Sequence, residues 1–206
     1  EASVTACRQA KERYEIVLDR TCFYPEGGGQ PGDTGTLNEV RVFDTHARDG
    51  EILHYTREPI APGTKVLAAL DWDRRFDYMQ QHSGEHMISG IIHRLFGLDN
   101  VGFHMGADVT TIDLSGGLSK EQLWEVEERV NRLICKNAPV KAWIPEPEKL
   151  REIPYRSKKE LTGEVRIVTF PNVDVCACCG THVTRTGEVG LIKFLSMSHY
   201  KSGVRI

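Results

Sequence analysis

The chain has 206 residues, with 26 basic and 29 acidic side chains and a formal net charge of -3 at pH 7. This balance argues against a protein that coats nucleic acid by charge alone, although it leaves room for a local basic patch. No run of residues approaches the ~18 apolar positions that a membrane-spanning helix needs. The N-terminal residues lack the basic and apolar regions of a signal peptide. We therefore expect a soluble, cytoplasmic protein.

The first part of the chain is rich in short β-prone runs separated by turn residues. Strands are predicted near residues 13–18, 36–43, 51–56 and 65–70. A glycine-rich run, Gly27 to Gly29 followed by Gln30, lies between the first two strands and matches neither P-loop nor dinucleotide-binding spacing. Short strands of this kind favour a small barrel or sandwich that ends near residues 70–75.

The remainder of the chain alternates helices with pairs of strands. Apolar residues recur at helical spacing over residues 73–96, and Gly97 is placed to end that helix. A second helix begins at Ser119, whose hydroxyl can cap it, with Gln122 as the partner in a capping box. Further strands are predicted near residues 101–105, 109–114, 140–144, 164–170 and 190–195, with a short helix after Pro145. This order predicts an α+β domain with helices packed on one face of a mostly antiparallel sheet.

Two pairs of metal-binding side chains share one spacing. His82 and His86 lie four residues apart on the first predicted helix, so their imidazoles project from the same face, one turn apart. Cys178 and His182 repeat the four-residue spacing far downstream. One thiolate and three imidazoles suit zinc in tetrahedral geometry. We therefore expect one zinc ion per chain, bound by these four residues.

This ligand set favours a catalytic zinc over a structural one. Structural sites are closed and usually rich in cysteine, whereas catalytic sites keep a position open for water or substrate. If His182 binds weakly, three ligands and a water remain, and the pKa of a metal-bound water can fall to ~7. A structural ion stays open as an alternative.

A second interpretation of the first pair uses Glu85. The string from His82 to His86 reads H-x-x-E-H, the signature of inverted zinc peptidases, in which Glu85 is the general base. Glu160 or Glu164 would then supply the third ligand. The weakness of this hypothesis is that the downstream cysteine and histidine pair is left without a role.

Several blocks of sequence resemble the alanyl-tRNA editing proteins of the AlaX family and the editing domain of alanyl-tRNA synthetase. In chain order the blocks are residues 23–35, 80–86, 101–106, 111–114, 178–183 and 186–190. The first block contains the glycine-rich run, and the second and fifth contain the two candidate metal-binding pairs. The likeness extends over roughly residues 15–206, with the motifs in the order of the family.

The resemblance implies a trans-editing hydrolase that removes serine, and also glycine, wrongly attached to the alanine tRNA, without ATP. It implies an N-terminal β-barrel domain over residues 1–72 and a zinc-binding editing domain over residues 73–206, as in the medium-length AlaX type. The expected partner is mischarged tRNA(Ala), with no DNA or membrane partner. Monomer and homodimer both stay open.

The thiols of this chain depart from the family pattern. Cys179 stands where the family often has Gly, so Cys176, Cys178 and Cys179 offer three thiols for one coordination position. Spacing favours Cys178, because only this residue lies four positions before His182. The family's synthetase version often has Gln at the position of Glu85, which argues against an indispensable base there.

The other candidate residues concern chemistry, specificity and tRNA contact. Glu85 and Gln81 are the candidate catalytic residues. The candidate substrate-binding residues are Gly27, Gly28, Gly29, Gln30, His104, Thr110 and Thr111. A partner for the serine hydroxyl is sought among the last three and Gln81. The candidates for contact with tRNA phosphates are Arg156, Lys158, Lys159, Lys193, Lys201 and Arg205.

Three functions stay open at this point. The first is a zinc-dependent aminoacyl-tRNA deacylase, and the second is an inverted-motif peptidase. The third is a non-catalytic tRNA-binding module with a structural zinc.

Overall fold

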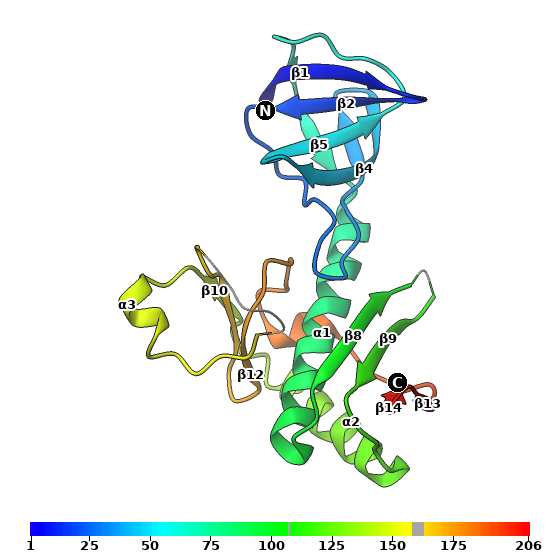
Figure 1. Ribbon diagram of the computed structural model, residues 1–206, viewed down its shortest axis with the longest axis vertical. Coiled ribbons are helices and arrows are strands. Elements are labelled where there is room, and N and C mark those ends of the chain that lie inside the picture. Colours follow the sequence, from blue (N-terminus) through cyan, green and yellow to red (C-terminus); the bar gives the residue numbers. More distant parts are fainter. Residues whose placement is uncertain (107, 158–162) are drawn as a thin grey trace. The chain divides into compact units, whose positions relative to one another are not determined.

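The computed structural model describes residues 1–106, 108–157 and 163–206 (Figure 1). The chain divides into two compact units, Glu1–Asp77 and Tyr78–Ile206. The described strands pair in antiparallel sheets and the helices are few, which agrees with the predicted α+β class. No helix among the described residues is long and apolar enough to cross a membrane.

The first unit is built on one seven-stranded antiparallel sheet. Its strands are β1 (Ala2–Ala10), β2 (Arg13–Leu18), β3 (Gly35–Leu37), β4 (Val40–Arg48), β5 (Glu51–Thr56), β6 (Lys65–Val66) and β7 (Ala68–Leu70). In the order β6-β1-β2-β5-β4-β3-β7, the two edge strands β6 and β7 are separated along the chain only by Leu67. The sheet therefore curves until its edges nearly meet, around a core that includes Ile16, Leu37 and Val42.

Two of the strands predicted in this unit are each divided in two. Residues 36–43 contribute to both β3 and β4, because Asn38 adopts a left-handed conformation with a φ of 54° and starts a tight turn. Residues 65–70 form β6 and β7, which pair with β1 and β3 respectively. The sequence does not predict β1, because its residues lack a clear alternation of apolar and polar side chains.

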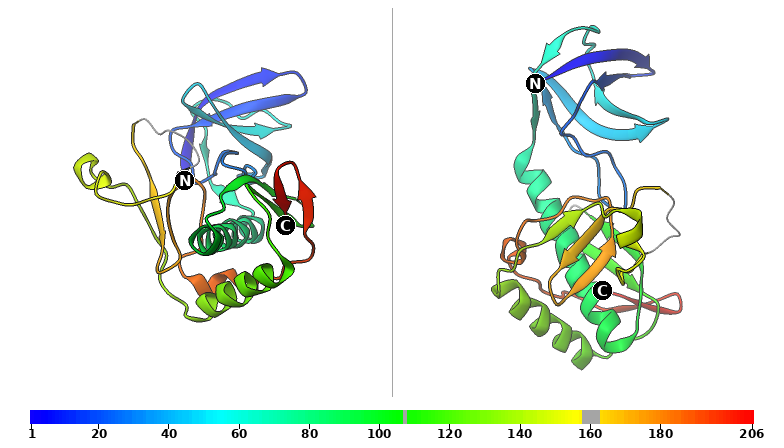
Figure 2. Two further views of the ribbon diagram at one scale, coloured as in Figure 1. Left: turned by 60° about the horizontal axis from the view of Figure 1, so that its bottom comes forward. Right: turned by 90° about the vertical axis from the view of Figure 1, so that its left-hand side faces the viewer.

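The second unit has two small antiparallel sheets that flank the helix α1 (Trp72–Phe96), as Figures 1 and 2 show. One sheet has the order β10-β11-β12, with β10 (Lys141–Trp143), β11 (Ile167–Phe170) and β12 (Asp174–Ala177). The other has the order β13-β14-β9-β8, with β8 (Asn100–Met105), β9 (Thr110–Leu114), β13 (Ser198–Tyr200) and β14 (Gly203–Arg205). The remaining elements are α2 (Lys120–Cys135), α3 (Pro147–Leu150) and the 3-10 helix η1 (Thr186–Val189). The strands thus form two sheets where the sequence predicts one.

The two long helices agree with the sequence prediction. Helix α1 ends before Gly97, whose φ of 67° suits glycine, and every residue of α1 from His82 to Ile92 is buried. Helix α2 begins after Ser119, whose side chain accepts a hydrogen bond from the backbone N–H of Gln122 in a complete capping box. A helix buried on all sides can present its histidines to side chains from several neighbouring elements.

The strand predicted over residues 190–195 is wrong, because this described segment is irregular. Side chains of α2 bind its backbone instead. Asn131 accepts a hydrogen bond from the N–H of Ile192 and donates one to its carbonyl, and Glu127 accepts one from the N–H of Phe194 at 2.7 Å. These polar backbone groups are therefore satisfied without a neighbouring strand.

Gly90 marks a very close approach of α1 to the start of β12. A Cβ at this position would lie 2.7 Å from the Asp174 Cβ and 2.7 Å from the Val173 carbonyl oxygen. We expect Gly90→Ala to lower the free energy of unfolding by about 1–3 kcal/mol, because a backbone contact cannot give way cheaply. The matched control is Gly84→Ala on the same helix, where the nearest atom is Ile192 Cδ1 at 3.3 Å, the end of a flexible side chain. Urea denaturation measures both variants, and equal losses of stability would contradict this account.

Candidate metal centre

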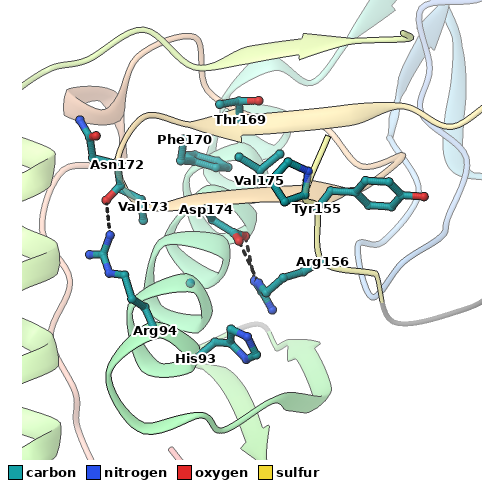
Figure 3. A pocket seen from close by; sticks show the side chains of 12 residues that line it. His93, Arg94, Tyr155, Arg156, Thr169, Phe170, Asn172, Val173, Asp174 and Val175 are labelled. Atoms are coloured by element: carbon teal, nitrogen blue, oxygen red, sulfur yellow. Dashed lines mark hydrogen bonds and ion pairs between the residues drawn. The ribbon is translucent and has the colours of Figure 1, made fainter. Parts of the chain in front are cut away.

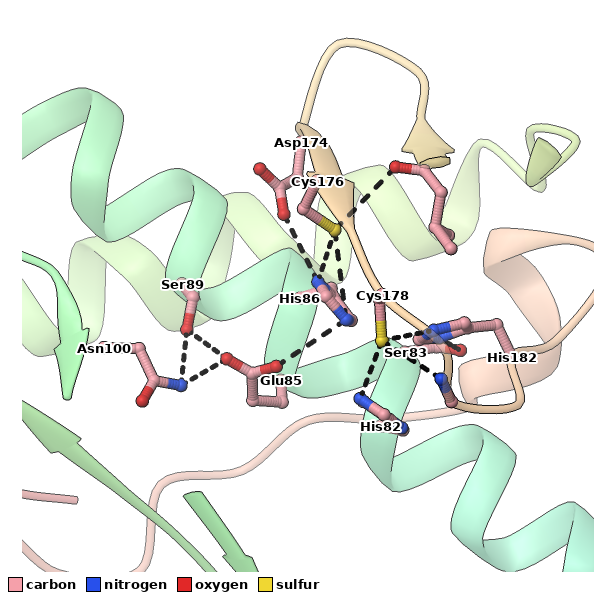
Figure 4. Close-up of polar contacts among 12 residues, drawn as sticks. His82, Ser83, Glu85, His86, Ser89, Asn100, Asp174, Cys176, Cys178 and His182 are labelled. Atoms are coloured by element: carbon pink, nitrogen blue, oxygen red, sulfur yellow. Dashed lines mark hydrogen bonds and ion pairs between the residues drawn. The ribbon is translucent and has the colours of Figure 1, made fainter. Parts of the chain in front are cut away.

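Helix α1 and the segment after β12 bring four metal-binding side chains together (Figure 4). His82 and His86 come from α1, and Cys178 and His182 come from the segment that follows β12. The three histidines are buried and Cys178 is half-buried. The ligand atoms of the four residues all lie within 4.8 Å of one another. These are the four residues that the sequence proposes as zinc ligands.

The measured separations suit a tetrahedral ion. The Sγ atom of Cys178 lies 3.5 Å from His82 Nε2 and 3.4 Å from His182 Nε2. With usual Zn–S and Zn–N bond lengths, a tetrahedral zinc separates its sulfur and nitrogen ligands by about 3.5 Å. The group can therefore hold a metal ion with little movement of these three side chains.

Hydrogen bonds fix the loop that carries Cys178 and His182. The guanidinium of Arg166 donates to the carbonyls of Cys178 at 2.8 Å and of Gly180 at 2.9 Å. On the helix side, the hydroxyl of Ser83 accepts from the backbone N–H of Val183 at 3.1 Å. The same hydroxyl lies 3.4 Å from His182 Nδ1, so that Ser83 ties α1 to the loop between two ligands.

The surroundings favour the ligating form of Cys178 and His182. Burial alone would raise the pKa of the Cys178 thiol, but hydrogen bonds with His182, His82 and His86 lower it to about 2. Burial lowers the pKa of His182 to about 3, although its contact with Cys178 acts in the opposite direction. At neutral pH the centre therefore offers a thiolate and a neutral imidazole, the forms that bind metal.

The pKa of His86 shifts in the opposite direction from that of His182. Burial disfavours a charge on this imidazole, but the nearby carboxylate of Glu85 and the contact with Asp174 raise its pKa well above the ordinary value. This direction favours the protonated imidazole in the metal-free protein, so a metal ion has to compete with a proton at His86.

The three neighbouring thiols have different surroundings. Cys178 belongs to the group with all three histidines, whereas Cys176 belongs to a second buried group with His86 and Asp174. Its Sγ lies 2.9 Å from His86 Nδ1. Cys179 is exposed, and neither group found among the described residues includes it. The arrangement agrees with the preference for Cys178 that spacing indicates.

The two candidate catalytic residues adjoin the ligands on α1. The Oε1 atom of Glu85, a buried carboxylate, accepts hydrogen bonds from Ser89 Oγ at 2.6 Å and from the amide of Asn100. Its Oε2 lies 3.9 Å from His86 Nε2. The side-chain carbonyl of Gln81 accepts a hydrogen bond from the hydroxyl of Thr110 on β9.

The peptidase interpretation requires a glutamate as third ligand, and neither metal-binding group among the described residues contains one. Glu164 is exposed and belongs to neither metal-binding group there. Glu160 lies outside the described residues.

The hairpin of β8 and β9 carries the other candidates of the second unit. His104 is exposed and pairs across the hairpin with Thr111, while Thr110 and Thr111 are half-buried. Phe103, which the sequence reasoning does not single out, lies with its ring centroid 5.5 Å from that of His82. Its place in the block 101–106 was the only sequence signal for it.

The glycine-rich run lies in the first unit, where it forms a turn. Gly27 and Gln30 exchange two backbone hydrogen bonds, and Gly28 and Gly29 between them have φ values of 61° and 86°. The hydroxyl of Tyr24 donates to the Gly27 carbonyl at 2.9 Å. Gln30 is fully buried, whereas Gly28 and Gly29 are exposed. Within this turn, Gly28 and Gly29 are therefore the residues most accessible to a substrate.

Several of the candidate tRNA-contact residues already pair with protein groups. Arg156 pairs with Asp174, Lys193 with Glu127, and Arg205 with Asp113. Lys201 lies over the ring of Tyr200. Lys158 and Lys159 lie outside the described residues. Contact of these basic residues with tRNA stays a prediction.

Two family models match the chain. Residues 165–206 match the model described as threonyl and alanyl tRNA synthetase second additional domain, and residues 1–74 match the model described as tRNA synthetases class II (A). The first match contains Cys178 and His182. The candidate centre therefore lies in part within a domain that the threonyl- and alanyl-tRNA synthetases share.

Similar proteins point to the alanyl-tRNA members of this group. The chain is 41% identical to the alanyl-tRNA editing protein AlaX-L of Pyrococcus horikoshii, over 95% of this chain and 50% of the relative. It is 37% identical to the alanyl-tRNA editing protein Aarsd1 of Mus musculus, over 88% of this chain and 45% of the relative. It is also 36% identical to the alanine–tRNA ligase of Pyrococcus abyssi, over 92% of this chain and 22% of that protein.

These matches confirm the resemblance that the motifs indicate, and the chain is a relative of the alanyl-tRNA editing proteins. It spans about half the length of the editing proteins that it matches. Whether it is of the medium-length type stays a prediction.

The raised pKa of His86 predicts that zinc competes with a proton at the centre. A protonated imidazole cannot bind metal, so we expect zinc binding to release protons at pH 7, and an affinity for zinc that rises with pH up to the pKa of His86. Isothermal titration calorimetry in buffers of different ionisation enthalpy measures this release. Binding without release of protons, together with an affinity that does not change with pH, would contradict the account.

Proposed function

We propose that this chain is a zinc-dependent trans-editing hydrolase that removes serine, and also glycine, from mischarged tRNA(Ala) by hydrolysing the aminoacyl ester. The observation that carries the proposal is the group of His82, His86, Cys178 and His182 in a chain related to alanyl-tRNA editing proteins. One thiolate with three imidazoles is a donor set typical of zinc. The reaction needs no ATP, and the cytoplasm, where tRNA is charged, is the expected location.

The centre and its neighbours divide the chemistry between them. A bound zinc ion would act as a Lewis acid, which polarises a carbonyl or lowers the pKa of a water molecule. Gln81 and Glu85 are the proposed catalytic residues, because each directly precedes a ligand on α1. Thr110 holds the side chain of Gln81 and Asn100 holds that of Glu85, so both are fixed from the β8–β9 hairpin.

Selection of serine over alanine calls for a polar partner in the site. A site that hydrogen-bonds the serine hydroxyl rejects alanine, because alanine leaves that partner unpaired. Thr110, Thr111 and His104 on the β8–β9 hairpin are the proposed partners, with Gln81 beside them. Phe103, packed on His82, would limit the size of the acyl group.

The proposal assigns a different role to each of the two domains. Residues 73–206 form the editing domain, and residues 1–72 form a β-barrel domain whose glycine-rich turn at Gly27, Gly28, Gly29 and Gln30 contributes to substrate binding. The exposed backbone of Gly28 and Gly29 supports this assignment, since glycine allows a ligand to approach the main chain closely. The proposed partner is tRNA. The chain would bind it as a monomer or as a homodimer.

A deacylation assay tests the proposal. We expect the zinc-loaded protein to hydrolyse seryl- and glycyl-tRNA(Ala), and to prefer seryl- over alanyl-tRNA(Ala) by at least about 100-fold. A chelator and the Cys178→Ala variant should each abolish this activity, and added zinc should restore only the chelated protein.

The competing functions predict different results for the same variants. The inverted-motif peptidase predicts that Glu85→Gln abolishes hydrolysis of peptides while Cys178→Ala is tolerated. A non-catalytic binding module predicts binding of tRNA without turnover. The proposal is overturned if the zinc-loaded protein hydrolyses none of the three charged tRNAs.

A further inference from the structure

The carboxylate of Asp174, which forms an ion pair with Arg156, lies next to the imidazole of His86. The Oδ2 atom of Asp174 is 3.4 Å from His86 Nδ1, and the guanidinium of Arg156 donates to both carboxylate oxygens of Asp174 at 2.8 Å each. The Asp174 side chain is only 3% exposed and that of Arg156 is 24% exposed. The deacylation chemistry proposed above assigns no role to either residue.

One explanation of this group is a second metal site. His86, Asp174 and Cys176 are all buried, and their ligand atoms lie within 4.8 Å of one another. Arg156 argues against this explanation, because its guanidinium already neutralises the carboxylate that a second cation would need.

The other explanation is orientation of a metal ligand. A histidine that binds a metal through one ring nitrogen almost always donates its other N–H to a carboxylate, a carbonyl or a water, and this contact fixes the tautomer and the ring. Here Nδ1 of His86 points to Asp174 and Cys176, which leaves Nε2 for the metal. Arg156 in turn fixes the carboxylate through two hydrogen bonds of 2.8 Å, one to each oxygen.

We propose that Asp174, held by Arg156, is a positioning residue that orients the imidazole of His86 for a single metal ion. This inference rests on the metal centre of the proposed function. The packing supports it, since the ring of Phe170 stacks on His86 with centroids 5.7 Å apart. The close packing at Gly90 also supports it, because only a glycine lets α1 approach Asp174 so closely.

The ion pair of Asp174 and Arg156 also forms part of the wall of a cavity, which has a volume of about 500 Å³. Figure 3 shows the pair among the side chains that line it. None of the four proposed metal ligands lines this cavity. The pair therefore lies between the cavity and His86, and substitutions that break it leave all four ligands in the chain.

Asp174→Asn tests the proposal, since it keeps the shape of the side chain and removes its charge. We expect the affinity for zinc, measured by competition with a chromophoric chelator, to fall about 10–100-fold. The ligand-field absorption of the cobalt-substituted protein should shift, which a merely structural role of Asp174 would not cause. Arg156→Gln leaves the carboxylate but removes the guanidinium that holds it, and should also lower the affinity for zinc. This variant replaces Asp174→Asn in the test if Asp174→Asn does not fold.

The chain offers a matched control. Arg205 clamps Asp113 through two hydrogen bonds of 2.6 and 2.8 Å, and Asp113 belongs to neither metal-binding group. Asp113→Asn should therefore cost stability of the metal-free protein without changing the zinc affinity or the cobalt spectrum. Cys176→Ala should keep the zinc affinity close to that of the unaltered protein.

Two results would overturn the positioning role. One is a zinc affinity of both Asp174→Asn and Arg156→Gln equal to that of the unaltered protein. The other is binding of two zinc ions by the unaltered chain and of one by Asp174→Asn, which would establish the second metal site. Hydrolysis of seryl-tRNA(Ala) by the unaltered, zinc-loaded protein is measured in parallel. If that hydrolysis is absent while the zinc affinities behave as expected, the proposed function fails and the positioning role stands.

Discussion

The close contact between α1 and the segment from Val173 to Val183 is what the metal centre depends on. At one end, Gly90 lets the helix reach the backbone of Val173, and at the other end Ser83 accepts a hydrogen bond from the N–H of Val183. Three of the four candidate ligands lie between these two contacts along the chain, and the fourth, His82, directly precedes Ser83. Because the elements are joined by packing and by hydrogen bonds, side chains from distant parts of the sequence converge on one point.

Charge decides which of these side chains bind a metal and which support it. Cys178, Asp174 and Glu85 each lie beside one of the histidines. A buried anion is costly unless a positive group or hydrogen bonds compensate it. Arg156 compensates Asp174, and the hydroxyl and amide of Ser89 and Asn100 bind Glu85. The Cys178 thiolate instead contacts the imidazoles of His82 and His182, which makes it the anion best suited to a dication.

Local rules predict the ligands better than their surroundings. A spacing of four residues on a helix puts His82 and His86 on one face, and helix caps follow from nearest neighbours in sequence, so both could be predicted. The pairing of Arg156 with Asp174 depends on how the chain returns to β12, which no local pattern encodes. For the same reason the segment at Ile192, bound by side chains of α2, was predicted as a strand. Propensity describes a residue alone and not the partner that satisfies its backbone.

X-ray absorption spectroscopy of the zinc-loaded protein tests the central claim most directly. The account predicts one sulfur ligand at about 2.3 Å and three nitrogen ligands at about 2.0–2.1 Å around a single zinc ion. The sulfur signal should disappear in Cys178→Ala and persist in Cys176→Ala. Two sulfur ligands, or a sulfur signal that survives the loss of Cys178, would contradict the assignment of the centre.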